Sequence, residues 1–435
     1  GSRCYLCKRG LCKINPGWCV LKMISRAPYF NSYKALLGAV VIIALATTFY
    51  LPHVDGIRIN RWLMLGISML AVCSMLASCR SISSGLFILW VAFTLYISQT
   101  IRIFEPLYST VCASVLFVAG AYSYNLWERH KNAIYNVICV IALINSTFAI
   151  MQAFGLYILL KPVSREIPIG LMSNPNELSA LMAICLPFFF RRRWAYAIPL
   201  VLAGLFLAKS SNGIMAVLII TSVYMFMKHR DDRRIVLFAI VGTAMCAALY
   251  MTYIDTNHAK SFQSRAYVWG KTAQAASVKL LRGWGFGQYQ YVVPLLTNPK
   301  GMSETQISAL IHLTSDKAAL EQAIKKVTGS NDYEGAKRYF ADDKNNIKTN
   351  FAQAHNEYVE LYFATGLVGI LLGLSFLAGS IIRGIGQPDK IPVLCLIASA
   401  STAIFFFTWQ IAPLAVITLL SLSIIHGHSK GGLSQ

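Results

Sequence analysis

One histidine stands at the start of a long apolar segment, where its type and position suit proton transfer. His355 and Asn356 open the segment 356–380. Imidazole is the usual general base near neutral pH. A helix that runs from His355 would place Gly366 three turns deeper on nearly the same face, with Gly369 about 40° away. Small residues on that face would let another helix approach closely. The alternative role for His355 is a structural hydrogen bond at the membrane surface.

An arginine earlier in the chain suits the binding of a phosphate group. Arg265 lies in the run Ser-Arg-Ala-Tyr-Val-Trp, one helical turn before Trp269 and on the same face. A guanidinium binds phosphate through a two-pronged fork and stabilises charge that develops on it. The run Arg-Gly-Trp-Gly-Phe-Gly follows around Trp284, and its glycines indicate a tight turn. The alternative for Arg265 is a surface position on an amphipathic helix.

Three more cations are candidates for anion binding. Lys209 precedes the sequence Ser-Ser-Asn-Gly, and Lys161 and Arg165 come before the apolar segment 172–190. A lysine offers a point charge in place of the arginine fork.

The same segment opens with a helix-start pattern, in which Asn174 is the N-cap, Pro175 the first helical residue and Glu177 the third. Capping alone explains this pattern, although an outward helix N-terminus would also attract a diphosphate.

Several other chemistries lack their signatures. The sequence has no Asp-x-Asp, no phosphate-binding P-loop and no dinucleotide-binding fingerprint. Cys4 and Cys7 have the spacing of half a zinc site, but no clear second half follows. We therefore expect neither a metal ion nor a cofactor.

The composition indicates a membrane protein. The 435 residues are 56% hydrophobic and 13% charged, with a mean hydropathy of +0.54, whereas a soluble domain has about 25% charged residues. A net charge of +21 in a soluble protein would indicate a nucleic-acid partner. In a membrane protein the placement of the charge matters more than its sum, so we expect a lipid bilayer and no nucleic acid as partner.

The predicted fold is an all-α integral membrane protein with about twelve transmembrane helices. A span needs roughly 20 mainly apolar residues, and the runs are continuous, which favours helices over barrel strands. The predicted spans are 34–52, 61–79, 83–100, 106–125, 132–154, 172–190, 194–209, 212–228, 234–254, 356–380, 391–409 and 411–427.

Basic residues in the short loops predict the orientation. With a cytoplasmic N-terminus, most of them, including Arg191–Arg193, lie on the cytoplasmic side. One large outer loop then carries two helices, about 262–281 and 316–328, the first ended by Gly283. The division is a cytoplasmic basic Cys-rich tail at 1–33, transmembrane helices 1–9 at 34–254, the large loop at 255–354, transmembrane helices 10–12 at 355–427, and a cytoplasmic tail at 428–435.

The arrangement of these motifs resembles that of a known family. His355-Asn356, nine residues, and then Gly366-Leu367-Val368-Gly369 looks like the His-Asn…Gly-x-x-Gly signature of the O-antigen ligase and polymerase superfamily. The large loop directly before this helix, Arg265 and the Gly-Trp-Gly turn also resemble that family, over residues 130–380. Asn212 departs from the pattern, because the family usually has an arginine there; Lys209 would then supply the cation.

The resemblance implies an inverting, metal-independent glycosyltransferase with a glycosyltransferase C-like fold, most like an O-antigen ligase. It would move a glycan from undecaprenyl diphosphate to lipid A–core at the periplasmic face of the bacterial inner membrane. The implied catalytic residues are His355 and Arg265. Diphosphate binding would involve Arg265, Lys209, Arg165 and Lys161, and the packing residues would be Asn356, Gly366, Gly369, Trp269 and Trp284.

Two other activities of the family and one non-enzymatic function stay open. The family alternatives are an O-antigen polymerase and a protein O-oligosaccharyltransferase. The non-enzymatic alternative is a lipid or solute transporter. A transporter would need ionisable residues deep within its spans, whereas nearly all charges here lie at span ends or in loops.

Overall fold

The computed structural model describes residues 124–157, 167–228, 256–285, 289, 292–293, 317–328, 354–406 and 408–427. All regular secondary structure in these residues is helical. The predicted spans 34–52, 61–79, 83–100 and 234–254, almost all of 106–125, both tails, and Lys161 and Arg165 lie outside the described residues.

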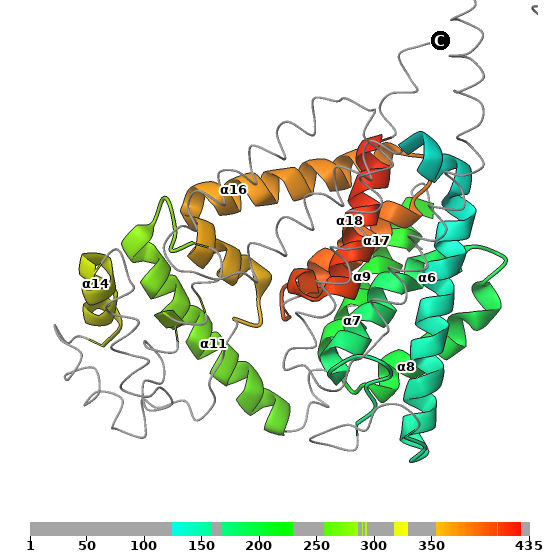
Figure 1. Cartoon of the computed structure of the whole chain (residues 1–435), viewed down its shortest axis with the longest axis horizontal. Coiled ribbons are helices and arrows are strands. Elements are labelled where there is room, and N and C mark those ends of the chain that lie inside the picture. The colour runs from blue at the N-terminus through cyan, green and yellow to red at the C-terminus, as the bar shows by residue number, and fades with distance from the viewer. Residues whose placement is uncertain are drawn as a thin grey trace, which may run out of the picture.

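The described helices follow in chain order (Figure 1). They are α6 (Tyr124–Ala153), α7 (Pro175–Cys185), η3 (Leu186–Phe190), η4 (Ala195–Ala197), α8 (Ile198–Leu207), α9 (Ser211–Lys228), α11 (Thr256–Ala276), η5 (Ser277–Lys279), α14 (Lys317–Thr328), α16 (Glu357–Gly386), α17 (Ile391–Thr402), η7 (Thr408–Gln410) and α18 (Ala412–Gly427).

Three stretches are long and apolar enough to cross a membrane, namely Ile134–Ala153 of α6, Ser211–Lys228 of α9 and Glu357–Gly386 of α16. The other apolar helices in the described part are shorter than the predicted spans. The span expected at 172–190 divides into α7 and the 3-10 helix η3, where Pro187 supplies no backbone N–H for an α-helical bond. The expected number of twelve spans exceeds what the described residues establish.

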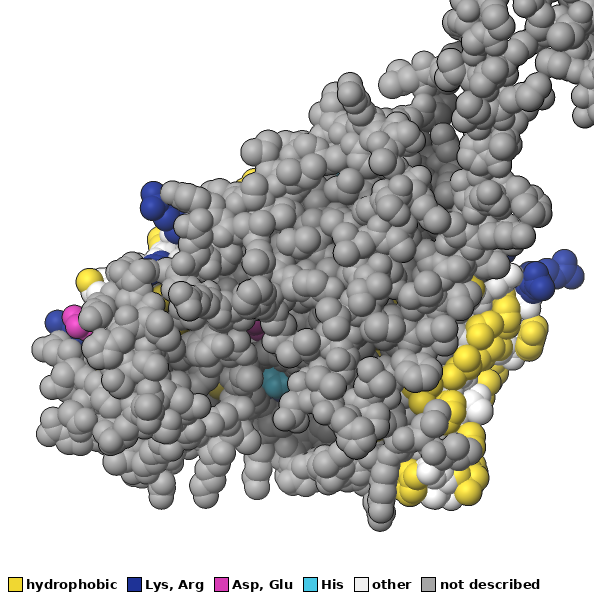
Figure 2. Space-filling view, viewed as in Figure 1, with side chains coloured by type: hydrophobic (Ala, Val, Ile, Leu, Met, Phe, Trp, Pro, Cys, Tyr) yellow, Lys and Arg dark blue, Asp and Glu magenta, His cyan; other side chains and the backbone are white. Residues whose placement is uncertain are grey.

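Five helices pack around α7 to form a bundle. The bundle contains α6, α7, α8, α9, α17 and α18, and it lies to the right in Figure 1. Every side chain of α7 from Glu177 to Cys185 is buried. Small residues allow close packing: a Cβ on Gly204 would lie 3.1 Å from the Cα of Ser146, and one on Gly213 would lie 2.5 Å from the carbonyl oxygen of Ser179. On the face seen in Figure 2, hydrophobic side chains gather at the lower right, where Figure 1 shows α6 and α8.

The chain passes back and forth through this bundle, so segments far apart in sequence meet at its two ends (Figure 1). At one end Lys131 forms an ion pair with Asp389 at 3.0 Å, and Arg191 lies close by on the adjoining turn. At the opposite end the hydroxyl of Ser210 donates to the side chain of Asn176 at 2.8 Å.

A second group of helices comprises α11, α14 and the first part of α16, to the left in Figure 1. The helix predicted at 262–281 is present as α11 followed by η5. The helix predicted at 316–328 is confirmed as α14, where Leu320 and Ile324 are buried on one stripe. Together with Val268 and Phe363, these residues form a second small hydrophobic core.

The prediction of a straight α16 starting at His355 is wrong in two respects. The helix begins at Glu357, because Asn356 is the N-cap and its side chain accepts the backbone N–H groups of Tyr358 and Val359, both at 3.0 Å. The helix also bends at Gly366, which has φ 66° and ψ −166°. His355, Gly366 and Gly369 therefore do not lie along one face of a straight helix.

The bend in α16 receives the Gly-Trp-Gly turn of the loop. The backbone N–H groups of Trp284 and Gly285 donate to the carbonyls of Phe363 and Ala364, each at 2.8 Å, and the N–H of Leu367 donates to Leu280 at 2.7 Å. We call this contact the glycine junction.

Two glycines make the junction possible. Gly283 and Gly366 both have positive φ, and a Cβ on either one would lie 2.5 Å from backbone atoms of the other segment. The partner expected at Gly366 was another membrane helix, whereas the observed partner is this turn. Gly369 faces its own helix, since a Cβ there would lie 2.1 Å from the Thr365 hydroxyl across the bend.

Aromatic packing completes the junction. The Trp284 ring stacks on Phe363 with centroids 6.0 Å apart, and its indole N–H donates to the carbonyl of Ala275 at 2.9 Å. Tyr289 packs edge-on against the same Phe363 at 5.5 Å, and burial raises the pKa of its phenol. The predicted motif residue Trp284 is therefore part of the contact that attaches α11 to α16.

Candidate functional site

His355 lies in the short segment that leads into α16. Its φ is +52°, a conformation that is uncommon for any residue other than glycine and that recurs at functional sites. The segment is attached on the side facing α11, where the indole N–H of Trp269 donates to the carbonyl of Ala354 at 2.6 Å. The backbone N–H of Ala354 also donates to the carboxylate of Glu360 at 3.2 Å. These bonds keep His355 outside the helix.

Arg265 projects from α11 one turn before Trp269 toward the same region. Its Nη1 donates to the carbonyl of Phe405 at 3.2 Å. Its Nε is buried and has no hydrogen-bond partner among the described residues. Burial lowers the pKa of this guanidinium. A buried donor without an acceptor costs about 1–3 kcal/mol, so this edge of Arg265 is suited to an incoming anion.

The turn 403–411 connects the surroundings of the two residues. The N–H of Glu357, two residues after His355, donates to the carbonyl of Ala403 at 2.9 Å. The same turn supplies the Phe405 carbonyl that binds Arg265, and the Phe405 ring lies 6.4 Å from the Trp269 ring. The structure thus attaches the helix of Arg265 and the segment of His355 to the same turn, although ninety residues separate the two residues in the sequence.

Glu357 belongs to this site and was not singled out from the sequence. Its side chain is 6% exposed, and its carboxylate accepts the N–H groups of Trp409 at 2.8 Å and Gln410 at 3.2 Å. The side-chain amide of Gln410 donates to the second carboxylate oxygen at 3.2 Å. An acidic residue in the first turn of a helix has an ordinary explanation in the helix dipole. Its position before an apolar run was the only signal of a further role.

The sequence had indicated that Lys209 lies at the end of a helix, but in the structure it lies outside the helices. It has φ +48°, is exposed, and occupies the turn between α8 and α9. The short turn brings the N-terminus of α9 beside that of α7, where the N–H of Gly213 donates to the Ser179 hydroxyl at 3.0 Å. Asn212, which stands where the family arginine was expected, is 4% exposed. Both of its amide atoms are buried without a hydrogen-bond partner in the described part of the chain.

The helix start predicted for α7 is confirmed. The Asn174 side chain accepts the N–H of Glu177 at 3.0 Å, with Pro175 at the first helical position. The Glu177 carboxylate in turn accepts the N–H of Ser173 at 3.1 Å. These bonds satisfy the backbone N–H groups of Glu177 and Ser173 at the start of α7.

Known proteins give no independent identification. No protein-family model matches the chain, and no curated protein sequence matches it. Function must therefore be argued from the residues and their arrangement.

Proposed function

We propose that this chain is a membrane glycosyltransferase that moves a glycan from undecaprenyl diphosphate to an acceptor hydroxyl, without a metal ion or cofactor. The observation that carries the proposal is the environment of Arg265. This buried guanidinium is anchored at Nη1 by the Phe405 carbonyl, lacks a described acceptor at Nε, and lies in the same region as His355. An anion-binding group and a titratable imidazole are the two parts that such a transfer needs.

Arg265 would bind the diphosphate and stabilise it as the leaving group. Charge grows on the diphosphate oxygens as the bond to the sugar breaks, and a desolvated guanidinium stabilises that charge more strongly than a solvated one. The bond to Phe405 holds the guanidinium before the substrate arrives. Lys209, Lys161 and Arg165 would add positive charge around the carrier, and the N-termini of α7 and α9 would add their dipoles.

His355 would act as the general base. It would remove the proton from the acceptor hydroxyl while that oxygen attacks the anomeric carbon. Attack from the face opposite the diphosphate forms the new glycosidic bond as the bond to the carrier breaks, which inverts the anomeric configuration. The proton then resides on the imidazole and the negative charge on the diphosphate held by Arg265.

The proposed location is the bacterial inner membrane, with the site at the periplasmic face. Two observations support this arrangement. Arg191–Arg193 and Lys131 lie at one end of the bundle, as the positive-inside rule expects for a cytoplasmic end. The turn 403–411 and His355 lie at the opposite end, since α17 starts beside Asp389 and ends at Thr402.

The proposed acceptor is lipid A–core, which makes the chain an O-antigen ligase. A glycolipid gel from two hosts tests this acceptor, one host lacking its O-antigen ligase and the other its polymerase. Glycan-capped lipopolysaccharide in the first host alone is the expected result. A ladder of repeats in the second host alone would identify a polymerase instead. No change in either host would direct attention to a protein acceptor.

The transfer itself is tested with the purified full chain in lipid nanodiscs and an undecaprenyl-diphosphate-linked glycan. Mass spectrometry would follow the loss of the lipid-linked donor. His355→Ala should lower turnover by about 10²–10⁴-fold, the usual contribution of a general base, and leave donor binding intact. Arg265→Lys should lower turnover because the fork is lost. Lys228→Arg is the control at an exposed cation of the opposite end. Normal turnover by His355→Ala would refute the base role.

A further inference from the structure

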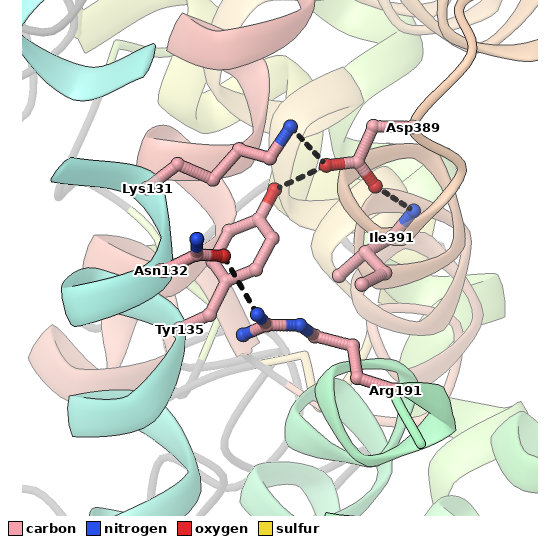
Figure 3. Close-up of polar contacts among 6 residues, drawn as sticks. All are labelled: Lys131, Asn132, Tyr135, Arg191, Asp389 and Ile391. Carbon is pink, nitrogen blue, oxygen red and sulfur yellow. Dashed lines mark hydrogen bonds and ion pairs between the residues drawn. The ribbon is translucent and has the colours of Figure 1, made fainter. Parts of the chain in front are cut away.

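A polar cluster closes the end of the bundle opposite the candidate site. It consists of Lys131, Asn132 and Tyr135 on α6, Arg191 after η3, and Asp389 before α17 (Figure 3). We call it the Arg191 cluster. The 12 residues of α17 separate it from the turn 403–411, which corresponds to about 18 Å at 1.5 Å per residue.

Both carboxylate oxygens of Asp389 accept hydrogen bonds from groups other than Arg191. One oxygen of Asp389 accepts Lys131 Nζ at 3.0 Å and the Tyr135 hydroxyl at 3.1 Å. The other oxygen accepts the N–H of Ile391 at 3.1 Å. Figure 3 shows the Tyr135 side chain between Asp389 and Arg191. Arg191 therefore lacks a carboxylate partner within the cluster.

Arg191 itself is only partly satisfied. Its Nη2 donates to the side-chain oxygen of Asn132 at 2.6 Å, and the guanidinium carbon lies 5.5 Å from the centre of the Tyr135 ring. Its Nη1 is buried and has no hydrogen-bond partner in the described part of the chain. Charged groups withdrawn from water are normally paired with an opposite charge. The cluster thus holds a cation, oriented by a neutral amide and a ring, with one donor left for an anion.

The surroundings of Arg191 are those of a membrane surface. The apolar window of α6 begins at Ile134, three residues beyond Lys131. Arg192 and Arg193 are exposed beside Arg191. Figure 2 shows basic side chains next to the upper end of the hydrophobic surface. With α6 as a membrane span, the charged groups would lie at the depth of lipid headgroups, where basic side chains attract anionic lipids.

An apolar stripe on α6 leads away from the cluster. Asn132, Asn136, Val140 and Ile144 follow at intervals of four residues and form a ridge that winds around α6 by about 40° at each step. Asn132 binds Arg191, and Asn136 accepts the indole N–H of Trp194 at 2.9 Å. Further along the stripe, Val140 and Ile144 are 43% and 40% exposed. A polar head and an apolar tail would both find a matching surface here.

We propose that Arg191, aided by Arg192 and Arg193, binds the phosphate of an anionic phospholipid whose acyl chain lies along Val140 and Ile144. The phosphate accepts from Arg191 Nη1 and supplies the negative charge that the cluster lacks. A free phosphate ion would use the cations but not the apolar stripe. This site is separate from the candidate active site and does not depend on the proposed function.

Native mass spectrometry of the delipidated full chain in detergent tests the proposal with phosphatidylglycerol and phosphatidylcholine as probes. The wild type should retain phosphatidylglycerol at least about ten-fold more tightly, because one hydrogen bond to a charged group is worth that factor. Arg191→Gln should remove the preference. Lys228→Gln removes a different cation, at the C-terminus of α9, and should keep the preference for phosphatidylglycerol.

A second variant distinguishes loss of the lipid site from misfolding of the protein. Asn132→Asp places a carboxylate next to Arg191 Nη2 and supplies the missing charge from within the protein. This variant should lose the preference for phosphatidylglycerol while keeping the thermal stability of the delipidated wild type. Equal retention of both lipids by the wild type would overturn the proposal. Unchanged preference in both Arg191→Gln and Asn132→Asp, or displacement of the lipid by millimolar inorganic phosphate, would do so as well.

Discussion

Replacing Gly366 with alanine tests the glycine junction. The φ of 66° and ψ of −166° at Gly366 belong to a region that is essentially restricted to glycine, so alanine is strained there by about 1–3 kcal/mol. Its Cβ would lie 2.5 Å from the carbonyl carbon of Leu281 and 2.7 Å from the N of Arg282. The two backbones must therefore separate.

Separation breaks the three backbone hydrogen bonds of the junction, donated by Trp284, Gly285 and Leu367. Each contributes about 1 kcal/mol net. Together with the strain, we expect a loss of about 4–6 kcal/mol. The matched control is Gly379→Ala on the same helix, where a Cβ would meet nothing within 4 Å. That control should gain about 0.5–1 kcal/mol from helix propensity.

Hydrogen exchange measured by mass spectrometry is the appropriate assay, because it reports the junction locally. The amides of Trp284 and Gly285 should be protected in the wild type and in Gly379→Ala, and should exchange rapidly in Gly366→Ala. Thermal unfolding gives the accompanying loss of stability. If these two amides remain protected in Gly366→Ala and its stability equals that of Gly379→Ala, the reasoning is refuted.

Three further predictions concern other contacts. Glu357→Ala should lower turnover by more than ten-fold, because the N–H groups of Trp409 and Gln410 lose their acceptor. Glu357→Gln keeps one acceptor oxygen and should retain most activity. Equal turnover of both variants in the donor assay would contradict this role. Trp269→Phe removes the bond to the Ala354 carbonyl and should destabilise the protein by about 1 kcal/mol in thermal unfolding, with a larger loss in turnover; an unchanged rate would argue against this anchor. Gly213→Ala would place a Cβ 2.5 Å from the Ser179 carbonyl oxygen and should cost about 1–3 kcal/mol, so a wild-type melting temperature would show that α7 and α9 separate easily.

Local patterns in the sequence predicted local structure well. The start of α7 could be predicted from Asn174 and Pro175 because capping depends only on neighbouring residues. The extent of α14 followed from the spacing of Leu320 and Ile324, which reports one buried face. These features need no information about distant parts of the chain.

The bend at Gly366 could not be predicted in the same way. Its cause is the turn at Gly283, which reaches it from the other end of the loop through backbone hydrogen bonds. A Gly-x-x-Gly pattern is equally compatible with a straight helix packed against a neighbour. The position of Lys209 outside a helix likewise depends on how α7 and α9 pack.

The sequence predicted which residues belong to the candidate site, but not the contacts that join them. The residue types of Arg265 and His355 indicated phosphate binding and proton transfer. Their connection runs through the turn 403–411, whose Phe405 contributes a carbonyl group and whose contact with Glu357 needs the folded chain. A main-chain acceptor leaves no signature in side-chain identity, so this part of the site is visible only in three dimensions.

The glycine junction also bears on how the loop could be exchanged between proteins. The hydrogen bonds that attach the 280–285 turn to α16 join main chain to main chain, so backbone shape sets the fit. A foreign segment that contains the same turn geometry should therefore dock on this helix whatever its remaining side chains are. The bend in α16 receives the turn through main-chain atoms, so the segment that carries the turn could be replaced while α16 is left unchanged.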